Sequence, residues 1–158
     1  MSTTTSWRIV KAARLADAFT GEGARRAGGR WNYPGTAMVY TAGSLALAAL
    51  EVLVHLDGPQ LLQSYVQIPV EFSERLCRSL DLDSLPDNWS GNPAPDWARS
   101  AGAEWLSSHE SVVLAVPSAV VPDEFVYLLN PRHNEFSALR LGQPDSFQFD
   151  PRLVKRLP

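Results

Sequence analysis

The chain has 158 residues, of which 45% are hydrophobic and 20% charged, and its formal net charge is -3. This length and composition suit one globular domain, and the negative charge argues against a surface built to bind nucleic acid. The single cysteine, Cys77, excludes an internal disulfide and fits a cytoplasmic chain, and no run approaches the roughly 20 apolar residues that a membrane span needs.

Charge is unevenly distributed along the chain. Residues 1–30 carry six arginines or lysines against Asp17 and Glu22, whereas residues 71–110 carry eight acidic residues against three arginines. Basic side chains near the N-terminus can form a site for an anion, although a charge cluster is more often a solvated face. Charge alone leaves both interpretations open.

The first part of the chain combines short regular elements with a glycine-rich loop. The pattern predicts a strand over Trp7–Val10, with Arg8 on the side opposite its apolar neighbours, and a helix over Ala12–Phe19. Residues 1–6 are polar and are predicted to fray. A dense group of glycines then predicts a loop that a ligand approaches closely. These glycines are Gly21, Gly23, Gly28 and Gly29.

A carboxylate stands inside an apolar helix in the next segment. Leu45–Leu56 is rich in Ala and Leu and predicts a helix with Ser44 as its N-cap. Within it Glu51 has Leu47 four residues before and Val54 three residues after, so its neighbours on the same face are aliphatic. An ionisable group in such a setting is a candidate functional residue.

The remaining elements indicate an α+β fold. A polar excursion over Leu82–Pro95 precedes an amphipathic helix over Asp96–Ser107, in which Trp97, Ala101 and Trp105 share a face. Helices and strands that mix without regular alternation favour α+β over a doubly wound sheet. Strands are predicted over Thr36–Thr41, Leu61–Val70, Ser111–Val121 with an interruption at Pro117, Glu124–Leu129, Ala138–Leu141 and Phe147–Phe149.

Three segments of the sequence carry a resemblance to a known family. The run GGRWNYPGTAMVYTAGSLALAALEVLVH, followed by VPSAVVP and LLNPRH, resembles the RES-domain family, whose members are toxins of bacterial toxin–antitoxin pairs. The resemblance extends from about Trp7 to about Arg140. On the family pattern the arginine is Arg30, the glutamate is Glu51 and the serine is Ser118, with Tyr40 at an aromatic position of the same pocket. The family often has a proline where this chain has Asn134, which leaves the roles of His133 and Asn134 unassigned.

The resemblance implies a fold, a substrate and a partner. The fold is that of the ADP-ribosyltransferase toxins, in a single RES domain over residues 1–158 with a core of about 7–142. NAD is the substrate, no separate cofactor is implied, and the toxic act is NAD depletion. Family members transfer ADP-ribose to a protein or release it to water or phosphate, and all three acceptors stay open here. The implied partner is an antitoxin with a helix-turn-helix DNA-binding domain that covers the pocket; the oligomeric state is not implied.

The residue types suit cleavage of the bond between nicotinamide and ribose. Glu51 would accept hydrogen bonds from ribose hydroxyls and stabilise the positive charge that develops on the sugar. Arg30 would contact the pyrophosphate or a ribose hydroxyl, or else form a salt bridge with Glu51. Tyr40 would stack on the substrate or simply pack in the core. Ser118 would donate a hydrogen bond to the substrate.

Rival chemistries have weaker support in the sequence. The residues around Ser118 lack the glycines of a nucleophile elbow, and the three histidines (His55, His109 and His133) have no metal-ligand spacing. A non-catalytic module that binds a nucleotide or a partner is the alternative from another class. Arg25 and Arg26 could form a basic rim that receives an acidic group of the antitoxin.

Overall fold

The computed structural model describes residues 2–153, and at its centre lies one mixed sheet of eight strands. Seven strands follow the order β4-β5-β6-β2-β1-β3-β7, and β8 pairs with β3 beside that path. The pairs are antiparallel except for β4 with β5. The strands are β1 (Thr3–Lys11), β2 (Val39–Ala42), β3 (Tyr65–Ser73), β4 (Cys77–Ser79), β5 (Val113–Pro117), β6 (Phe125–Leu129), β7 (Arg140–Leu141) and β8 (Asp145–Phe147).

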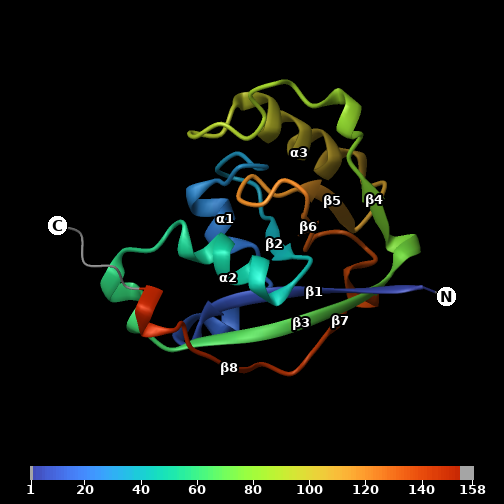
Figure 1. The fold of residues 1–158 in the computed structure, drawn as a ribbon. Helices are drawn as coiled ribbons and strands as arrows, with labels where there is room; N and C mark the ends of the chain where they lie inside the picture. Colours follow the sequence, from blue (N-terminus) through green and yellow to red (C-terminus); the bar gives the residue numbers. More distant parts are fainter. Residues whose placement is uncertain (1, 154–158) are drawn as a thin grey trace.

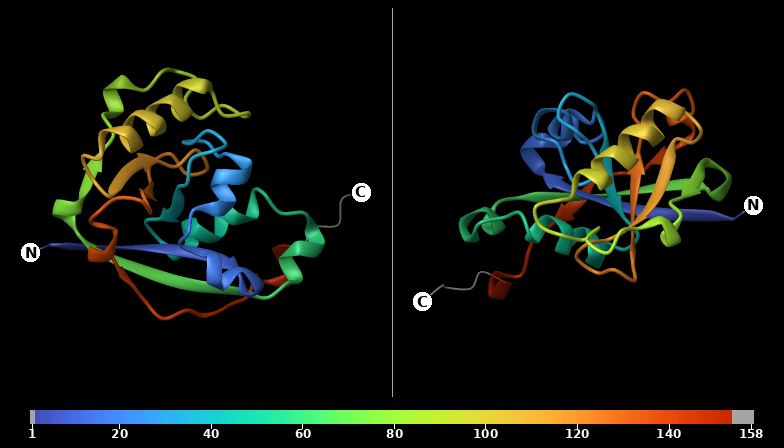
Figure 2. Two further views of the ribbon diagram at one scale, coloured as in Figure 1. Left: turned by 180° about the vertical axis from the view of Figure 1, so that it is seen from behind. Right: turned by 90° about the horizontal axis from the view of Figure 1, so that it is seen from above.

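Three α-helices accompany the sheet in the described part of the chain. They are α1 (Glu22–Ala27), α2 (Leu45–Leu53) and α3 (Asp96–Ser108). Figure 1 shows the long strands β1 and β3 side by side along the base, α3 at the opposite end of the molecule, and α1 and α2 between them. Seen from above, α3 crosses over the strands (Figure 2). No helix within residues 2–153 is long and apolar enough to cross a membrane.

The longest pairing in the sheet joins β1 to β3. It runs from Thr3 opposite Ser73 to Lys11 opposite Tyr65. β1 is paired from Thr3 onward, so the prediction of fraying was wrong for Thr3–Ser6, because pairing with β3 supplies partners for their backbone groups. Met1 lies outside the described residues. β5 is buried along its whole length between β4 and β6, which explains its uninterrupted apolar sequence.

The predicted α+β class is confirmed. The helices predicted over Leu45–Leu56 and Asp96–Ser107 are also confirmed, and they correspond to α2 and α3. The segment Ala12–Phe19, which was predicted to be helical, contains a 3-10 helix over Ala12–Asp17. The glycine-rich segment contains α1, which begins directly after Gly21 in a left-handed conformation (φ 75°). Gly21 therefore supplies a turn before a helix, and the prediction of a loop was wrong for Glu22–Ala27. All four glycines nevertheless line the cavity described below.

Helix α3 is held against the segment that carries Arg30. Ala98 and Trp105 are buried, and the Trp97 ring meets the Trp31 ring edge to face at 6.2 Å. Between them Gly102 lies so close to Trp31 that an added Cβ would overlap its carbonyl oxygen. The glycine thus lets the backbones of α3 and the Trp31 turn come into direct contact.

Candidate active site

A cavity of about 1110 Å³ lies between the sheet, α2 and the segment that precedes α3. Cavities that bind drug-sized ligands span about 300 to 1,000 Å³, so this one has room for a dinucleotide. Its lining combines an apolar surface with a few charged side chains from different elements. The charged or titratable residues that line it are Arg8, Asp17, Arg30, Tyr40, Glu51, His55 and Arg99.

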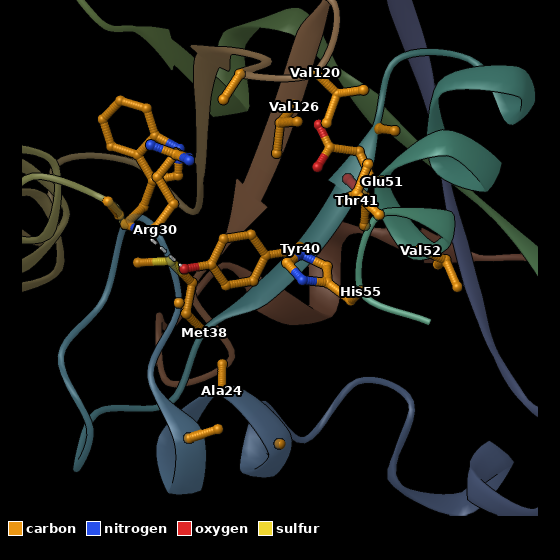
Figure 3. A pocket seen from close by; sticks show the side chains of 18 of the residues that line it. Ala24, Arg30, Met38, Tyr40, Thr41, Glu51, Val52, His55, Val120 and Val126 are labelled. Atoms are coloured by element: carbon orange, nitrogen blue, oxygen red, sulfur yellow. Dashed lines mark hydrogen bonds between the residues drawn. The ribbon is translucent and has the colours of Figure 1, made fainter. Parts of the chain in front are cut away.

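Helix α2 places Glu51 in the cavity wall. Ser44 caps the helix by accepting a hydrogen bond from the Leu47 backbone N–H at 3.0 Å, as the sequence predicts. Leu47 and Ala48 bury one face of the helix in the core, and Glu51 follows one turn later at the edge of that face. Its carboxylate is half-buried and points into the cavity (Figure 3).

Ser118 holds the Glu51 carboxylate from behind. The Ser118 hydroxyl donates to Glu51 Oε1 at 2.6 Å. The same hydroxyl oxygen accepts hydrogen bonds from the backbone N–H groups of Val120 and Val121, both at 3.0 Å. These two donors fix the oxygen, so its one proton is directed at Glu51.

This arrangement changes the role assigned to Ser118. The side chain is 1% exposed and its proton is given to Glu51, so it does not reach the cavity to contact a substrate. This geometry does not support the predicted direct contact with a substrate, and the observed contact of Ser118 is with Glu51. Across the described residues Glu51 Oε2 has no partner, and this oxygen is left for a ligand.

Arg30 lies on the opposite side of the cavity from Glu51 (Figure 3). Its Nη1 donates to the backbone carbonyls of Trp89 at 3.1 Å and Gly91 at 2.9 Å. Burial lowers the pKa of Arg30, and the Glu51 charge opposes that shift. No ion pair joins Arg30 to Glu51 in the described structure, so the salt-bridge alternative is not realised. Both charges face the cavity separately.

The ring of Tyr40 lies between these two charged groups (Figure 3). Its hydroxyl donates to Asn32 Oδ1 at 2.6 Å and accepts from the Trp31 backbone N–H at 3.1 Å. Burial raises the pKa of Tyr40 well above its ordinary value. The hydroxyl is thus committed to the protein, while the ring lines the cavity and also packs on the core.

Asn32 is a site residue that the sequence did not reveal. It is wholly buried, and its Nδ2 donates to the carbonyls of Ala24 at 2.9 Å, Tyr33 at 3.1 Å and Thr36 at 3.2 Å. With the bond from Tyr40, the amide ties the turn that carries Arg30 to β2. Its position inside GGRWN was visible, but an asparagine after glycines is more often only a turn residue.

Arg8 is a second residue that sequence reasoning missed. Its Nε donates to the Ala18 carbonyl at 2.8 Å and its Nη1 to the Tyr40 carbonyl at 3.1 Å. Burial lowers its pKa to about 10, so the guanidinium is still charged at neutral pH. Among the described residues no carboxylate pairs with it. Carbonyls do not neutralise a cation, so Arg8 keeps its positive charge at the cavity wall.

The RES domain model matches residues 5–150 of the chain. The chain belongs to the RES domain family. It is 44% identical over 148 residues to Toxin Res of Yersinia enterocolitica, covering 93% of this chain and 97% of that protein. It is 36% identical to the Prs ADP-ribosylating toxin of a Sphingobium species, and the match covers 98% of this chain and 99% of that protein.

A solved structure shares the fold of this RES domain. A chain of the MbcT–MbcA toxin–antitoxin complex of M. tuberculosis matches with a TM-score of 0.78 at 21% identity, across 97% of this chain and 87% of that chain. The family resemblance inferred from the sequence is confirmed. The predicted likeness to the fold of ADP-ribosylating toxins is also confirmed, because the fold matches that of a chain of a toxin–antitoxin complex and a relative is named for that activity.

The histidines have different surroundings in this RES domain. His133 is buried, its Nε2 lies 2.9 Å from the His109 carbonyl oxygen, and its Nδ1 accepts from the Glu135 N–H at 3.0 Å. Both ring nitrogens bond to the backbone, so the part it plays is structural. His55 lines the cavity, as does Tyr40 (Figure 3). No cluster of potential metal ligands is found within residues 2–153.

Proposed function

We propose that this protein is a toxin that breaks the bond between nicotinamide and ribose in NAD. The main support is the Glu51 carboxylate, which Ser118 fixes in a cavity wall that faces the Arg30 guanidinium. The bond breaks through a transition state in which the ribose gains positive charge, so a fixed carboxylate beside the sugar stabilises it. The relatives named as toxins support the biological role.

The other cavity residues suit binding and orientation of NAD. The guanidinium groups of Arg30 and Arg8 face the same cavity and offer hydrogen-bond donors to the pyrophosphate. The Tyr40 ring lies between Arg30 and Glu51, where it can stack on the nicotinamide or cover the ribose. No metal ion or cofactor is needed for this chemistry, since the carboxylate provides the negative charge.

The test is release of nicotinamide from NAD by purified protein. Glu51→Gln keeps the size and a hydrogen-bonding oxygen but removes the charge, and we expect the rate to fall at least about a hundredfold. Wild-type protein that is well folded yet releases no nicotinamide, with water, phosphate and candidate acceptor proteins all supplied, would refute the proposal.

A matched variant controls for the loss of a carboxylate. Glu104 is exposed on α3 and does not line the cavity, so Glu104→Gln makes the same chemical change away from the site. Its rate is expected to equal that of wild type. In cells, expression of wild type should arrest growth and lower NAD, expression of Glu104→Gln should do the same, and Glu51→Gln should relieve both effects.

Transfer of ADP-ribose to a protein is a second candidate. It is favoured by the 36% identity, over nearly the whole chain, to a relative named as an ADP-ribosylating toxin. Both reactions release nicotinamide, and they differ in what accepts the ribose. Identification of the second product separates them: free ADP-ribose indicates water, ADP-ribose 1-phosphate indicates phosphate, and a protein that gains the mass of ADP-ribose indicates transfer.

A non-catalytic nucleotide-binding module makes the opposite prediction for these experiments. NAD would raise the melting temperature of such a protein without being consumed, and Glu51→Gln would bind it as well as wild type. A module that binds only a protein partner would show no heat of binding with NAD. Calorimetry next to the release assay therefore separates the enzyme from both alternatives.

We also propose that a helix-turn-helix antitoxin covers this cavity. The support is the shared fold with a chain of a toxin–antitoxin complex. Within residues 2–153 the basic rim predicted at Arg25 and Arg26 keeps only the Arg26 charge unpaired, because Glu22 binds Arg25 at 2.8 Å. Arg26→Ala should therefore lower the affinity for the cognate antitoxin more than Arg25→Ala does. It should also reduce the salt dependence of that affinity more. Equal or absent effects would remove the rim from the interface.

A further inference from the structure

Arg99 reaches the cavity from α3, on a different element from those that carry the other charged residues. It lines the same cavity as Arg30 and Glu51. The Arg99 guanidinium carbon lies 5.9 Å from the centre of the Tyr33 ring, within the range of a cation–π contact. This contact orients a long side chain that would otherwise be free to rotate.

The charge of Arg99 is not neutralised within the described chain. Asp96, three residues earlier on α3, is the carboxylate best placed to pair with it on the helix surface. Its Oδ1 instead accepts a hydrogen bond from the Tyr33 hydroxyl at 2.8 Å. Across residues 2–153 the Arg99 guanidinium forms no ion pair. An oriented guanidinium at a cavity wall is thus free to bind an anion.

The order of the charged residues along the cavity indicates how the proposed substrate would lie relative to Arg99. Glu51 stands on one side, and Arg30 stands on the other, bound to the loop residues Trp89 and Gly91 (Figure 3). The chain continues from this loop into α3, which carries Arg99. A dinucleotide with its nicotinamide ribose at Glu51 and its pyrophosphate toward Arg30 therefore extends toward α3 with its adenosine half.

We propose that Arg99 contacts a phosphate group on the adenosine side of the bound dinucleotide. This inference rests on the proposed function for the class of ligand. The phosphate belongs either to the pyrophosphate or to a 2′-phosphate on the adenosine ribose, and both offer oxygens to a guanidinium. Arg99 thereby sets affinity and specificity at the end of the ligand farthest from the bond that breaks.

The experiment measures binding in the Glu51→Gln background, where the ligands are not consumed. The probes are nicotinamide riboside, which has no phosphate, NAD, and NADP. Arg99→Gln should weaken NADP binding about tenfold, should weaken NAD binding equally if the contact is to the pyrophosphate, and should leave nicotinamide riboside binding unchanged. A larger loss for NADP than for NAD assigns the 2′-phosphate, and equal losses assign the pyrophosphate.

Two further variants separate charge from structure. Arg14 is exposed and does not line the cavity, so Arg14→Gln removes the same charge elsewhere and should leave all three affinities unchanged. Arg99→Lys keeps the charge and should retain part of the NAD affinity. An unchanged NAD and NADP affinity in folded Arg99→Gln protein overturns the inference. So does an equal loss for all three probes, which indicates a structural role.

Titration with inorganic pyrophosphate distinguishes failure of this inference from failure of the proposed function. If wild type turns over NAD while Arg99→Gln binds NAD, NADP and pyrophosphate normally, the role of Arg99 alone is overturned. Wild type that binds pyrophosphate but does not consume NAD overturns the enzyme. The pyrophosphate and NADP affinities of Arg99→Gln then still decide the role of Arg99. Wild type that binds neither NAD nor pyrophosphate overturns both.

Discussion

The two sides of the cavity hold their charged groups in different ways. On the α2 side, one buried hydroxyl fixes the Glu51 carboxylate, and backbone amides fix that hydroxyl in turn. On the other side, Arg30 binds the carbonyls of Trp89 and Gly91, which belong to a loop that also lines the cavity. The carboxylate is preset by the core, whereas the guanidinium is linked to the position of a surface loop.

This difference suits the tasks proposed for each side. Stabilisation of a transition state requires a charge that does not reorganise during the reaction, and the Glu51 side provides it. Entry and release of a large ligand require a wall that can move, and a loop is the element of a fold most able to do so. Mutations on the two sides are therefore expected to have different signatures.

After Glu51→Gln, the largest effect is expected from Ser118→Ala. Without the hydroxyl, Glu51 loses its orientation, and NAD cleavage should fall about tenfold to a hundredfold, mainly in kcat. Ser111→Ala is the control, because Ser111 is also a buried serine with a donor, Trp105 Nε1, and an acceptor, the Val113 carbonyl. Both variants should lose similar stability, and Ser111→Ala should keep its activity. Full activity in Ser118→Ala would contradict the preset carboxylate.

Next in size is the effect of Arg30→Lys, which tests the loop side. An ammonium group cannot reproduce the planar contact to two carbonyls, and activity should fall about tenfold. Hydrogen exchange of residues 88–94 should become faster at the same time, while that of α2 stays unchanged. Arg26→Lys, on the exposed surface of α1, is the control for the substitution. Unchanged exchange in the loop would show that Arg30 does not restrain it.

A pair of glycine substitutions tests how α3 is held over the Arg30 turn. At Gly102 a methyl group would overlap the Trp31 carbonyl, and the free energy of unfolding should fall by about 3 kcal/mol. At Gly23, within α1, an added Cβ would have no neighbour within 4 Å. Gly23→Ala should therefore raise the free energy of unfolding by about 0.5–1 kcal/mol. Chemical denaturation measures both. Equal effects of the two substitutions would show that α3 does not contact Trp31 closely.

The smallest effect on activity is expected from Tyr40→Phe. The ring stays in place, so NAD cleavage should change by less than about threefold, because the hydroxyl is committed to Asn32 and Trp31. The same substitution leaves two buried polar groups without partners, and stability should fall by about 1–3 kcal/mol. Tyr40→Leu removes the ring and should reduce activity more strongly. A large loss of activity in Tyr40→Phe would assign the hydroxyl to the substrate.

The α2 side of the site could be predicted well from the sequence. An Ala- and Leu-rich run with a serine cap specifies a helix through local interactions, and the position of Glu51 on that helix follows from its period. The contact between Glu51 and Ser118 could not be predicted, because it joins residues 67 positions apart. The serine was found through resemblance, and its role depended on knowing which atoms meet.

The residues missed on the other side share one property. Arg8 and Asn32 act through bonds to backbone carbonyls, and a sequence does not show where those carbonyls will lie. α1 was missed for a related reason. Its six residues include a glycine, and the Gly21 turn and the Glu22–Arg25 pair support it more than helix propensity does. Local signals were sufficient where elements are long and apolar, and insufficient where tertiary contacts decide.

The 67-residue separation between Glu51 and Ser118 has a consequence for synthesis of the chain. At roughly 5–20 residues per second, a ribosome needs about 3 to 13 seconds to proceed from one to the other. Throughout that interval the carboxylate exists without the hydroxyl that orients it. The nascent chain therefore has no assembled centre until β5 and the residues after it have emerged and paired.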